Sequence, residues 1–221
     1  MKKTIAIVQT SNVSAATLKA LCDQILPGVQ VHMLSDDSLI REINACGGPT
    51  LAVRRRLYQY FQAAASLGVD LILNQCSSVG EVVDMIQPFV DVPIVKIDEP
   101  MAKKAVELGR KIAMIATVAT TVQPSSRLIE AMALKAGKDI VLDKCLVEGA
   151  MMMLIEKGDV KAHNDLVLGA VEAAARDNDV IVLAQGSMTV LLPLLSHVQK
   201  PVLTSPQLAI EHLRDLLFSV T

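Results

Sequence analysis

Aromatic residues are scarce in this chain, which has 2 tyrosines, 3 phenylalanines and no tryptophan among its 221 residues. Hydrophobic residues nevertheless make up 52% of the sequence. The core must therefore be built from Val, Ile, Leu, Ala and Met, a composition typical of stacked layers of strands and helices. A chain of this length is sufficient for one large domain or two small ones.

An excess of charge of either sign is also missing, because the net charge is −2 at pH 7 and the charges are mixed along the chain. We therefore expect neither nucleic acid nor an anionic membrane as a partner. The most apolar stretch, residues 179–195, is interrupted by polar residues, glycine and proline, so it cannot supply the roughly 20 apolar residues of a membrane helix. The N-terminus lacks the pattern of a cleavable signal, and we expect a cytoplasmic protein.

Cysteine pairs and common cofactor motifs are not found either. The four cysteines, at positions 22, 46, 76 and 145, show no C-x-x-C pair and no zinc-ligand spacing, so we expect reduced thiols and no metal. The sequence has no glycine-rich dinucleotide loop and no Walker loop, so we expect no nucleotide cofactor. Cys22 and Cys145 lie in apolar periodic segments typical of a core, whereas Cys46 lies beside Gly47 in an expected loop.

Short apolar runs alternate with longer amphipathic ones along the chain. The short runs lack period-two polarity, which predicts parallel strands covered by helices on both faces. Prolines 49, 124 and 206 mark expected helix starts, and Gly68 and Gly137 mark expected helix ends. The expected strands are 4–9, 29–34, 70–75, 93–97, 111–117, 139–145, 179–185 and 201–204, and the expected helices are 14–25, 50–67, 79–88, 101–108, 124–136, 160–176, 188–196 and 206–218.

The two halves of the chain can be laid over one another. KKTIAIVQTSNV matches GRKIAMIATVAT, which sets Thr10 against Thr117, and VDLILNQCSSVG matches NDVIVLAQGSMT, which sets Cys76 against Gln185. An internal duplication predicts two pseudo-symmetric doubly wound α/β units, each with a four-stranded parallel sheet. We expect the first unit at residues 1–100 with the C-terminal helix 207–221, and the second unit at residues 101–206.

Polar residues gather where the expected strands end, and open parallel sheets bind ligands beyond the carboxyl ends of their strands. If the two units face one another, Thr10, Cys76, Thr117 and Gln185 converge on one cleft. Cys76 precedes an expected helix, whose N–H groups and dipole would favour a thiolate and would also suit a carboxylate ligand. The alternative is that Cys76 is a small buried hydrophobic residue.

The segments NQCSSVG, IATVATT and VLAQGSM, together with the two-unit layout, resemble the Asp/Glu racemase superfamily over essentially the whole chain. That superfamily includes aspartate, glutamate and hydantoin racemases, maleate isomerase and arylmalonate decarboxylase. The resemblance implies a cofactor-independent isomerase that moves a proton at the carbon alpha to a carboxylate or carbonyl. The implied substrate is a small carboxylic acid or a cyclic amide, with one cysteine on each of its faces.

Carried over to this sequence, the first of those cysteines is Cys76, whereas Gln185 occupies the position of the second. An amide can orient or polarise a substrate but cannot act as an acid or base, so a symmetric two-thiol racemase is not expected. Proton transfer, isomerisation and decarboxylation by a lyase remain open, as does an inactive relative that only binds a carboxylate. Asp98, Glu99 and Ser187 are candidates for a second acid or base, although Asp98 and Glu99 also suit a charged loop before a helix.

Hydroxyl, amide and backbone groups near the expected strand ends are candidates for binding the substrate. His197 and His212 fall in an expected loop and an amphipathic helix, and the arginines at 54–56 on an expected solvated helix face, so we do not assign them to the site. Apolar surface expected on helix 50–67 predicts a homodimer. The candidate binding residues are Thr10, Ser11, Asn12, Asn74, Ser77, Ser78, Thr117, Thr120, Thr121, Gly186 and Ser187.

Overall fold

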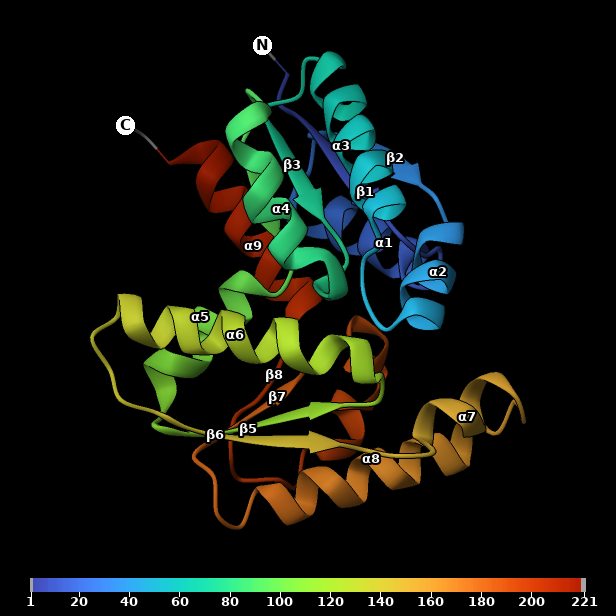
Figure 1. Cartoon of the computed structure of the whole chain (residues 1–221). Helices are drawn as coiled ribbons and strands as arrows, with labels where there is room; N and C mark the ends of the chain where they lie inside the picture. The colour runs from blue at the N-terminus through green and yellow to red at the C-terminus, as the bar shows by residue number, and fades with distance from the viewer. Residues whose placement is uncertain (1, 220–221) are drawn as a thin grey trace. The chain divides into compact units, whose positions relative to one another are not determined.

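The computed structural model describes residues 2–219, and contacts within the chain divide it into two compact units (Figure 1). The first unit extends to Ile97 and takes in the chain from Pro206 onward, and the second unit is Asp98–Ser205. Each unit has one four-stranded, wholly parallel sheet, with strand order β2-β1-β3-β4 in the first unit and β6-β5-β7-β8 in the second.

The sheet of the first unit is covered by helices on both faces. Phe61 of α3 belongs to a cluster of buried residues on one face, and Leu18 of α1 packs with Leu213 of α9 on the other. The elements of this unit are β1 (Thr4–Gln9), α1 (Ala15–Ile25), β2 (Gln30–Ser35), α2 (Ser38–Cys46), α3 (Leu51–Ser66), β3 (Leu71–Asn74), η1 (Ser77–Val79), α4 (Gly80–Ile86), η2 (Gln87–Phe89), β4 (Ile94–Lys96) and α9 (Ser205–Phe218).

The second unit repeats this arrangement. Met114 of β5 faces α6, where its sulfur accepts a hydrogen bond from Ser126 Oγ, while its neighbours Ala113 and Ile115 pack on the opposite face with α8 and η3. The elements are α5 (Glu99–Leu108), β5 (Lys111–Ala116), α6 (Ala119–Lys135), β6 (Val141–Leu146), α7 (Ala150–Ile155), α8 (Val160–Ala174), β7 (Val180–Leu183), η3 (Gly186–Leu195) and β8 (Val202–Thr204).

Matching hydrogen bonds fix the third strand against the first in each unit. In each unit, an aspartate just before the third strand donates its N–H to the carbonyl of the first residue of the first strand. The carboxylate of the aspartate accepts from the N–H of that first-strand residue. After the third strand, the next N–H donates to the carbonyl near the end of the first. The matched residues are Asp70 with Thr4 and Gln75 with Val8 in the first unit, and Asp179 with Lys111 and Ala184 with Ile115 in the second.

The expected alternation of strands and helices is confirmed, and each of the expected strands lies within two residues of its expected bounds. The helices α3 and α6 end just before Gly68 and Gly137, and both glycines adopt the positive φ that favours glycine after a helix. Thr50 is the N-cap of α3, where its hydroxyl accepts from Val53 N at 3.2 Å.

Three details of the expected elements are wrong. Helix α6 begins at Ala119 and continues through Pro124, although a proline inside a helix removes one backbone hydrogen bond. Segment 188–196 forms part of the 3-10 helix η3 and not an α-helix. The short helices α2 and α7 were not anticipated, and Cys46 ends α2 and does not lie in a loop.

No helix within residues 2–219 is long and apolar enough to cross a membrane.

Candidate active-site residues at the carboxyl edges of the sheets

In the first unit, the loops after β1 and β3 are joined by Gln75. Its N–H donates to Val8 O at 3.0 Å, and its Nε2 donates to Ser14 Oγ at 2.6 Å. Of the candidate residues after β1, Thr10 is buried, Ser11 accepts from Val13 N at 3.3 Å, and Asn12 is exposed. The structure therefore places these candidates beside the segment that carries Cys76.

Cys76 lies immediately beyond β3, at the N-cap of η1, with an extended backbone. Asn74 Nδ2 donates to Cys76 O at 2.9 Å, and Asn74 is itself fully buried. Asn74 thus holds the backbone of the cysteine, and its Oδ1 has no hydrogen-bond partner among the described residues.

The surroundings of Cys76 are largely apolar. The residue is 8% exposed and belongs to the hydrophobic cluster that includes Val79 and Val83. The helix that follows is a 3-10 turn leading into α4, and neither element has a side-chain hydrogen bond at its N-cap. The binding candidates Ser77 and Ser78 both lie within η1, directly after Cys76.

In the second unit, Gln185 occupies the position beyond β7 that matches Cys76 beyond β3. Its Oε1 accepts from Thr117 N at 3.0 Å and from Thr117 Oγ1 at 3.3 Å. Because a backbone N–H can only donate, this contact fixes the orientation of the amide. Gln185 Nε2 therefore points away from Thr117, and it is buried with no acceptor in residues 2–219.

This geometry changes the roles of several candidates in the second unit. The N–H and hydroxyl of Thr117, which we expected to hold substrate oxygens, are engaged by Gln185. Thr120 and Thr121 lie in the first turn of α6 and not in a loop, and the N-cap of that helix, Val118, makes no side-chain cap. Backbone N–H groups at the start of a helix are available to an anion. Gly186 and Ser187 begin η3 and are partly exposed.

The candidates for a second acid or base lie in different settings. Asp98 is buried at the N-cap of α5, where its carbonyl accepts from Ala102 N, and Glu99 is the first residue of that helix. His197 is exposed and bonds to Glu172 at 3.0 Å. His212 is partly exposed within α9. The structure thus places Asp98 and Glu99 at a helix start, the alternative considered for them.

The remaining thiols differ from one another in exposure. Burial, reinforced by the charge of Asp23, raises the pKa of Cys22 to about 11. Burial also raises the pKa of Cys145, although this residue is only partly buried and so is less of a core residue than expected. Cys46 is exposed. A raised pKa leaves little thiolate at neutral pH, so Cys22 and Cys145 are poor nucleophiles.

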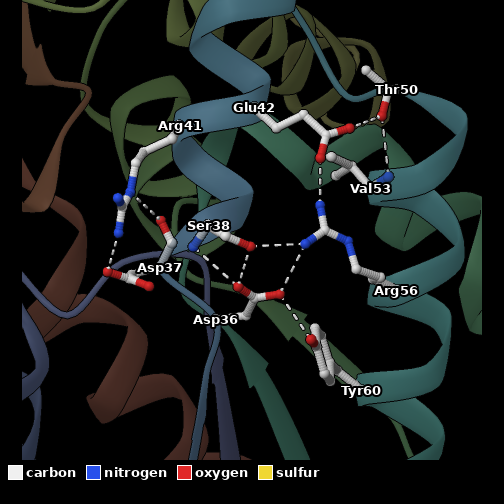
Figure 2. Close-up of polar contacts among 9 residues, drawn as sticks. All are labelled: Asp36, Asp37, Ser38, Arg41, Glu42, Thr50, Val53, Arg56 and Tyr60. Atoms are coloured by element: carbon white, nitrogen blue, oxygen red, sulfur yellow. Dashed lines mark hydrogen bonds and ion pairs between the residues drawn. The ribbon is translucent and has the colours of Figure 1, made fainter.

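Sequence reasoning missed an ion-pair cluster at the carboxyl end of β2 (Figure 2). Arg56 of α3 donates to Asp36 at 3.2 Å, to Ser38 Oγ at 2.8 Å and to the carboxylate of Glu42. We name these residues, together with Thr50 and Tyr60, the Arg56 cluster. Arg56 was expected on a solvated face. Three consecutive arginines carry no signal that one of them turns inward to join α3 to α2.

The Arg56 cluster perturbs the titration of its members. Burial opposes ionisation of Asp36, but hydrogen bonds from Ser38 and Tyr60 and the charge of Arg56 outweigh it and hold the pKa of Asp36 below its usual value. The bond to Asp36 in turn raises the pKa of Tyr60. Asp36 N also donates to Gln9 O at 3.1 Å, so the cluster anchors the residue that precedes Thr10.

A second group that sequence reasoning did not single out is His163, which is buried in the first turn of α8. It shares one face with Val167 and Val171, and that stripe reads as ordinary core in the sequence. Among the described residues, no group of three or more His, Cys, Asp or Glu side chains is arranged to hold a metal ion.

The fold of two parallel α/β units is shared by solved structures. Glutamate racemase from Francisella tularensis subsp. tularensis SCHU S4 superposes with a TM-score of 0.73 at 16% identity, covering 99% of this chain and 82% of that one. Aspartate racemase from Picrophilus torridus gives 0.72 at 15% identity, covering 97% and 94%. Allantoin racemase from Klebsiella pneumoniae gives 0.70 at 16% identity, covering 97% and 87%.

At these identities the structural likeness establishes the fold, and the family follows from the sequence. The model of the Asp/Glu/Hydantoin racemase family matches residues 8–213. The chain belongs to this family and is an isomerase of the racemase class. No curated protein sequence gives a significant match.

Proposed function

We propose that this enzyme moves a proton at the carbon alpha to a carboxylate or carbonyl, without a cofactor, using Cys76 as its acid/base and Gln185 to orient or polarise the substrate. One observation carries the proposal. The two residues occupy matched positions, each at the N-cap of a 3-10 helix just beyond the third strand of its unit. In this family's pattern, as the sequence resemblance implies it, both positions hold thiols.

The proposed reaction uses the two positions differently. The thiolate of Cys76 removes the proton from the carbon alpha, and the electron pair of that C–H bond moves toward the carboxylate or carbonyl oxygen. Gln185 Nε2, with its carbonyl held by Thr117, donates a hydrogen bond to an oxygen that gains charge. The apolar residues around Cys76 exclude water from the carbanion.

The substrate class follows from the donors at the second unit's sheet edge. Gln185 Nε2 presents buried N–H groups that have no acceptor among the described residues, and such donors suit carboxylate or carbonyl oxygens. The similar enzymes are named for glutamate, aspartate and allantoin, two amino acids and a cyclic amide. We propose a small carboxylic acid or a cyclic amide, held by the candidate hydroxyl, amide and backbone groups of both units.

We further propose that the enzyme is a cytoplasmic homodimer. The exposed apolar side chains of Leu51 and Tyr58 on α3 support the dimer, and sedimentation velocity tests it, since a purely monomeric species at micromolar concentration would contradict it.

The decisive experiment is deuterium exchange at the carbon alpha in D₂O, followed by NMR for both hands of aspartate, glutamate and allantoin, and for substituted malonates. The wild-type enzyme should exchange one hand of its substrate much faster than the other. Cys76→Ala should lower that exchange at least 100-fold, because general acid–base catalysis contributes about that much. Cys145→Ala is the matched control and should retain exchange.

Other outcomes decide among the alternatives. Full activity in Cys76→Ala would remove the thiol from the mechanism, and equal exchange of both hands with racemisation would contradict the role of Gln185. Loss of CO₂ from a malonate would identify a lyase. Binding without any exchange would identify the inactive relative, which the apolar burial of Cys76 favours.

A further inference from the structure

His163 is a titratable residue at a position built for an apolar one. It is 3% exposed and shares the inner face of α8 with Val167 and Val171. Those two valines belong to the buried cluster that lies against β5 and β7. A histidine in such a place loses its hydration, so its ring nitrogens must be hydrogen-bonded if the burial is not to be costly.

The first unit shows what the fold alone requires at this point. Helix α3 buries Val53, Leu57 and Phe61 at successive turns, as α8 buries His163, Val167 and Val171. Both helices start with a side-chain cap, from Thr50 in α3 and from Asp159 in α8. A valine is therefore sufficient for packing in the first turn, and the histidine of the second unit calls for another explanation.

Only one nitrogen of the His163 ring is bonded within the described residues. Nδ1 lies 2.9 Å from Asn164 Oδ1. When the ring donates to that oxygen, the proton of the neutral ring is on Nδ1. Nε2 then carries a lone pair, and it is buried without a donor. Among the described residues, Gln185 Nε2 and Thr189 Oγ1 are also buried without a partner.

The fold brings these atoms to one edge of the sheet. Strand side chains alternate between faces, so Thr117 continues the face of Ala113 and Ile115, and Gln185 continues the face of Ile181 and Leu183. This is the face that α8 covers. Helix α8 returns from the carboxyl end of β6 to the start of β7, so its first turn lies at the carboxyl edge, on the side toward which the arrows of β5 and β6 point (Figure 1). Helix α8 also contacts η3, which begins at Gly186.

We propose that His163 is the proton-carrying residue of the second unit and that its Nε2 bonds to a water, whose oxygen accepts one of the two N–H groups of Gln185 Nε2 while the other donates to the substrate oxygen. An acceptor on His163 and a donor on Gln185 match the hydrogen-bonding needs of a buried water. Its part in catalysis rests on the function proposed above. For the hand of the substrate that exchanges more slowly, the water takes the proton from the carbon alpha and passes one of its own to Nε2, leaving an imidazolium. In the reverse direction, the imidazolium returns a proton to the water as the water protonates the carbanion.

The first test needs no substrate. Nitrogen NMR of the full chain labelled in its histidine rings, with His163→Gln used to identify the signal, should show Nδ1 protonated and Nε2 accepting a hydrogen bond. Gln185→Leu removes the donor that holds the water and should shift the His163 Nε2 resonance. The control Val190→Ala, at an exposed position of η3, should leave it in place. An Nε2 resonance that is the same in wild type and Gln185→Leu would overturn the proposal.

The second test separates a proton carrier from a packing residue. His163→Gln retains an amide near the position of Nε2 but cannot carry a proton, so exchange at the carbon alpha of the slower hand should fall about 100-fold or more. Exchange of the faster hand, which Cys76 serves, should remain within a few-fold. In His163→Ala, added imidazole should restore part of the lost exchange. An equal loss for both hands, or no rescue, would reduce His163 to a packing role. A wild type inactive on every acid would instead contradict the proposed function, while the NMR result would still decide the hydrogen bonding of His163.

Discussion

The two units of this chain share one backbone plan but place different chemistry on it. In both units an aspartate fixes the start of the third strand, and a matched N–H secures its end. The first unit then offers the thiol of Cys76 at the carboxyl edge and Val53 in the first turn of the covering helix. The second unit offers the amide of Gln185 and the imidazole of His163 at the corresponding places.

This difference teaches which positions the fold leaves free for chemistry. The aspartate that fixes the start of the third strand recurs in both units because its carboxylate bonds to the first strand, whereas the other matched bonds use backbone groups that any of these residues can supply. The residue just beyond the third strand does not recur, because its side chain takes no part in those bonds. An amide at that position can still bind through Nε2, yet it transfers no proton. The proposed enzyme therefore treats the two faces of its substrate unequally.

The largest expected effect comes from making the two units alike. Gln185→Cys supplies a thiol at the position matching Cys76, so exchange of the slower hand should rise by about 100-fold, the scale of general acid–base catalysis. Gln185→Ala removes the amide without supplying an acid or base and serves as the control. The measurement is deuterium wash-in for each hand of the substrate. Equal rates in the two variants would show that the matched position does not face the reacting carbon.

A smaller effect is expected from the Arg56 cluster, which stiffens the first unit at β2. Asp36→Asn should lower the free energy of unfolding at pH 7 by about 1–3 kcal/mol, since it removes the charge from a bonded and largely buried carboxylate. Urea unfolding measures the loss. Asp37→Asn is the matched control, because Asp37 pairs with Arg41 at an exposed site and should contribute less than about 1 kcal/mol.

The pH dependence of the Asp36 variant gives a check on its cause. The pKa of Asp36 lies below 3.8 in the folded protein, so its ionised form stabilises the fold at every pH above 3.8. That stabilisation is lost as the pH falls through the folded pKa of Asp36, because the folded wild-type protein then binds the proton that the unfolded chain already holds. The difference between wild type and Asp36→Asn should therefore shrink below pH 3.8. A constant difference would assign the effect to packing.

The smallest effect sharpens the comparison of the covering helices. Thr50→Ala and Asp159→Ala each remove the N-cap hydrogen bond of a matched helix, α3 or α8. Each should cost about 1 kcal/mol of stability, measured by urea unfolding. Asp159→Asn keeps an acceptor and should cost less than Asp159→Ala. A loss confined to one helix would show that the two helices are not equivalent in stability.

Much of the fold could be predicted from the sequence because strands and helices leave periodic signals. The eight strands and their pairing into two repeats follow from local apolar runs and from the matched segments around Thr10 and Thr117. The start of helix α6 could not be predicted from the sequence. A proline such as Pro124 usually indicates the first turn of a helix, whereas here it lies in the second turn. The short helix α2 was missed although Gly47 ends it with a positive φ, because its nine residues give only a short apolar repeat.

The candidate site was predictable in position but not in detail. The ends of the expected strands indicated where Cys76 and Gln185 lie, because the direction of the chain alone decides which edge of a parallel sheet holds the carboxyl ends of its strands. Which of three arginines turns inward depends on where Asp36 and Glu42 lie after folding. The burial of His163 depends on α8 packing against β5 and β7.

The sequence by itself determined the family and the repeat of the α/β plan, and it predicted Gln185 at the place of a second thiol, because these depend only on residue order. Tertiary structure decided that Thr117 holds the carbonyl of Gln185, that apolar side chains surround Cys76, and that His163 lies buried with Nε2 unpartnered among the described residues. Such facts depend on contacts between segments far apart in the chain, and no local pattern of residues encodes the direction in which a side chain finally points.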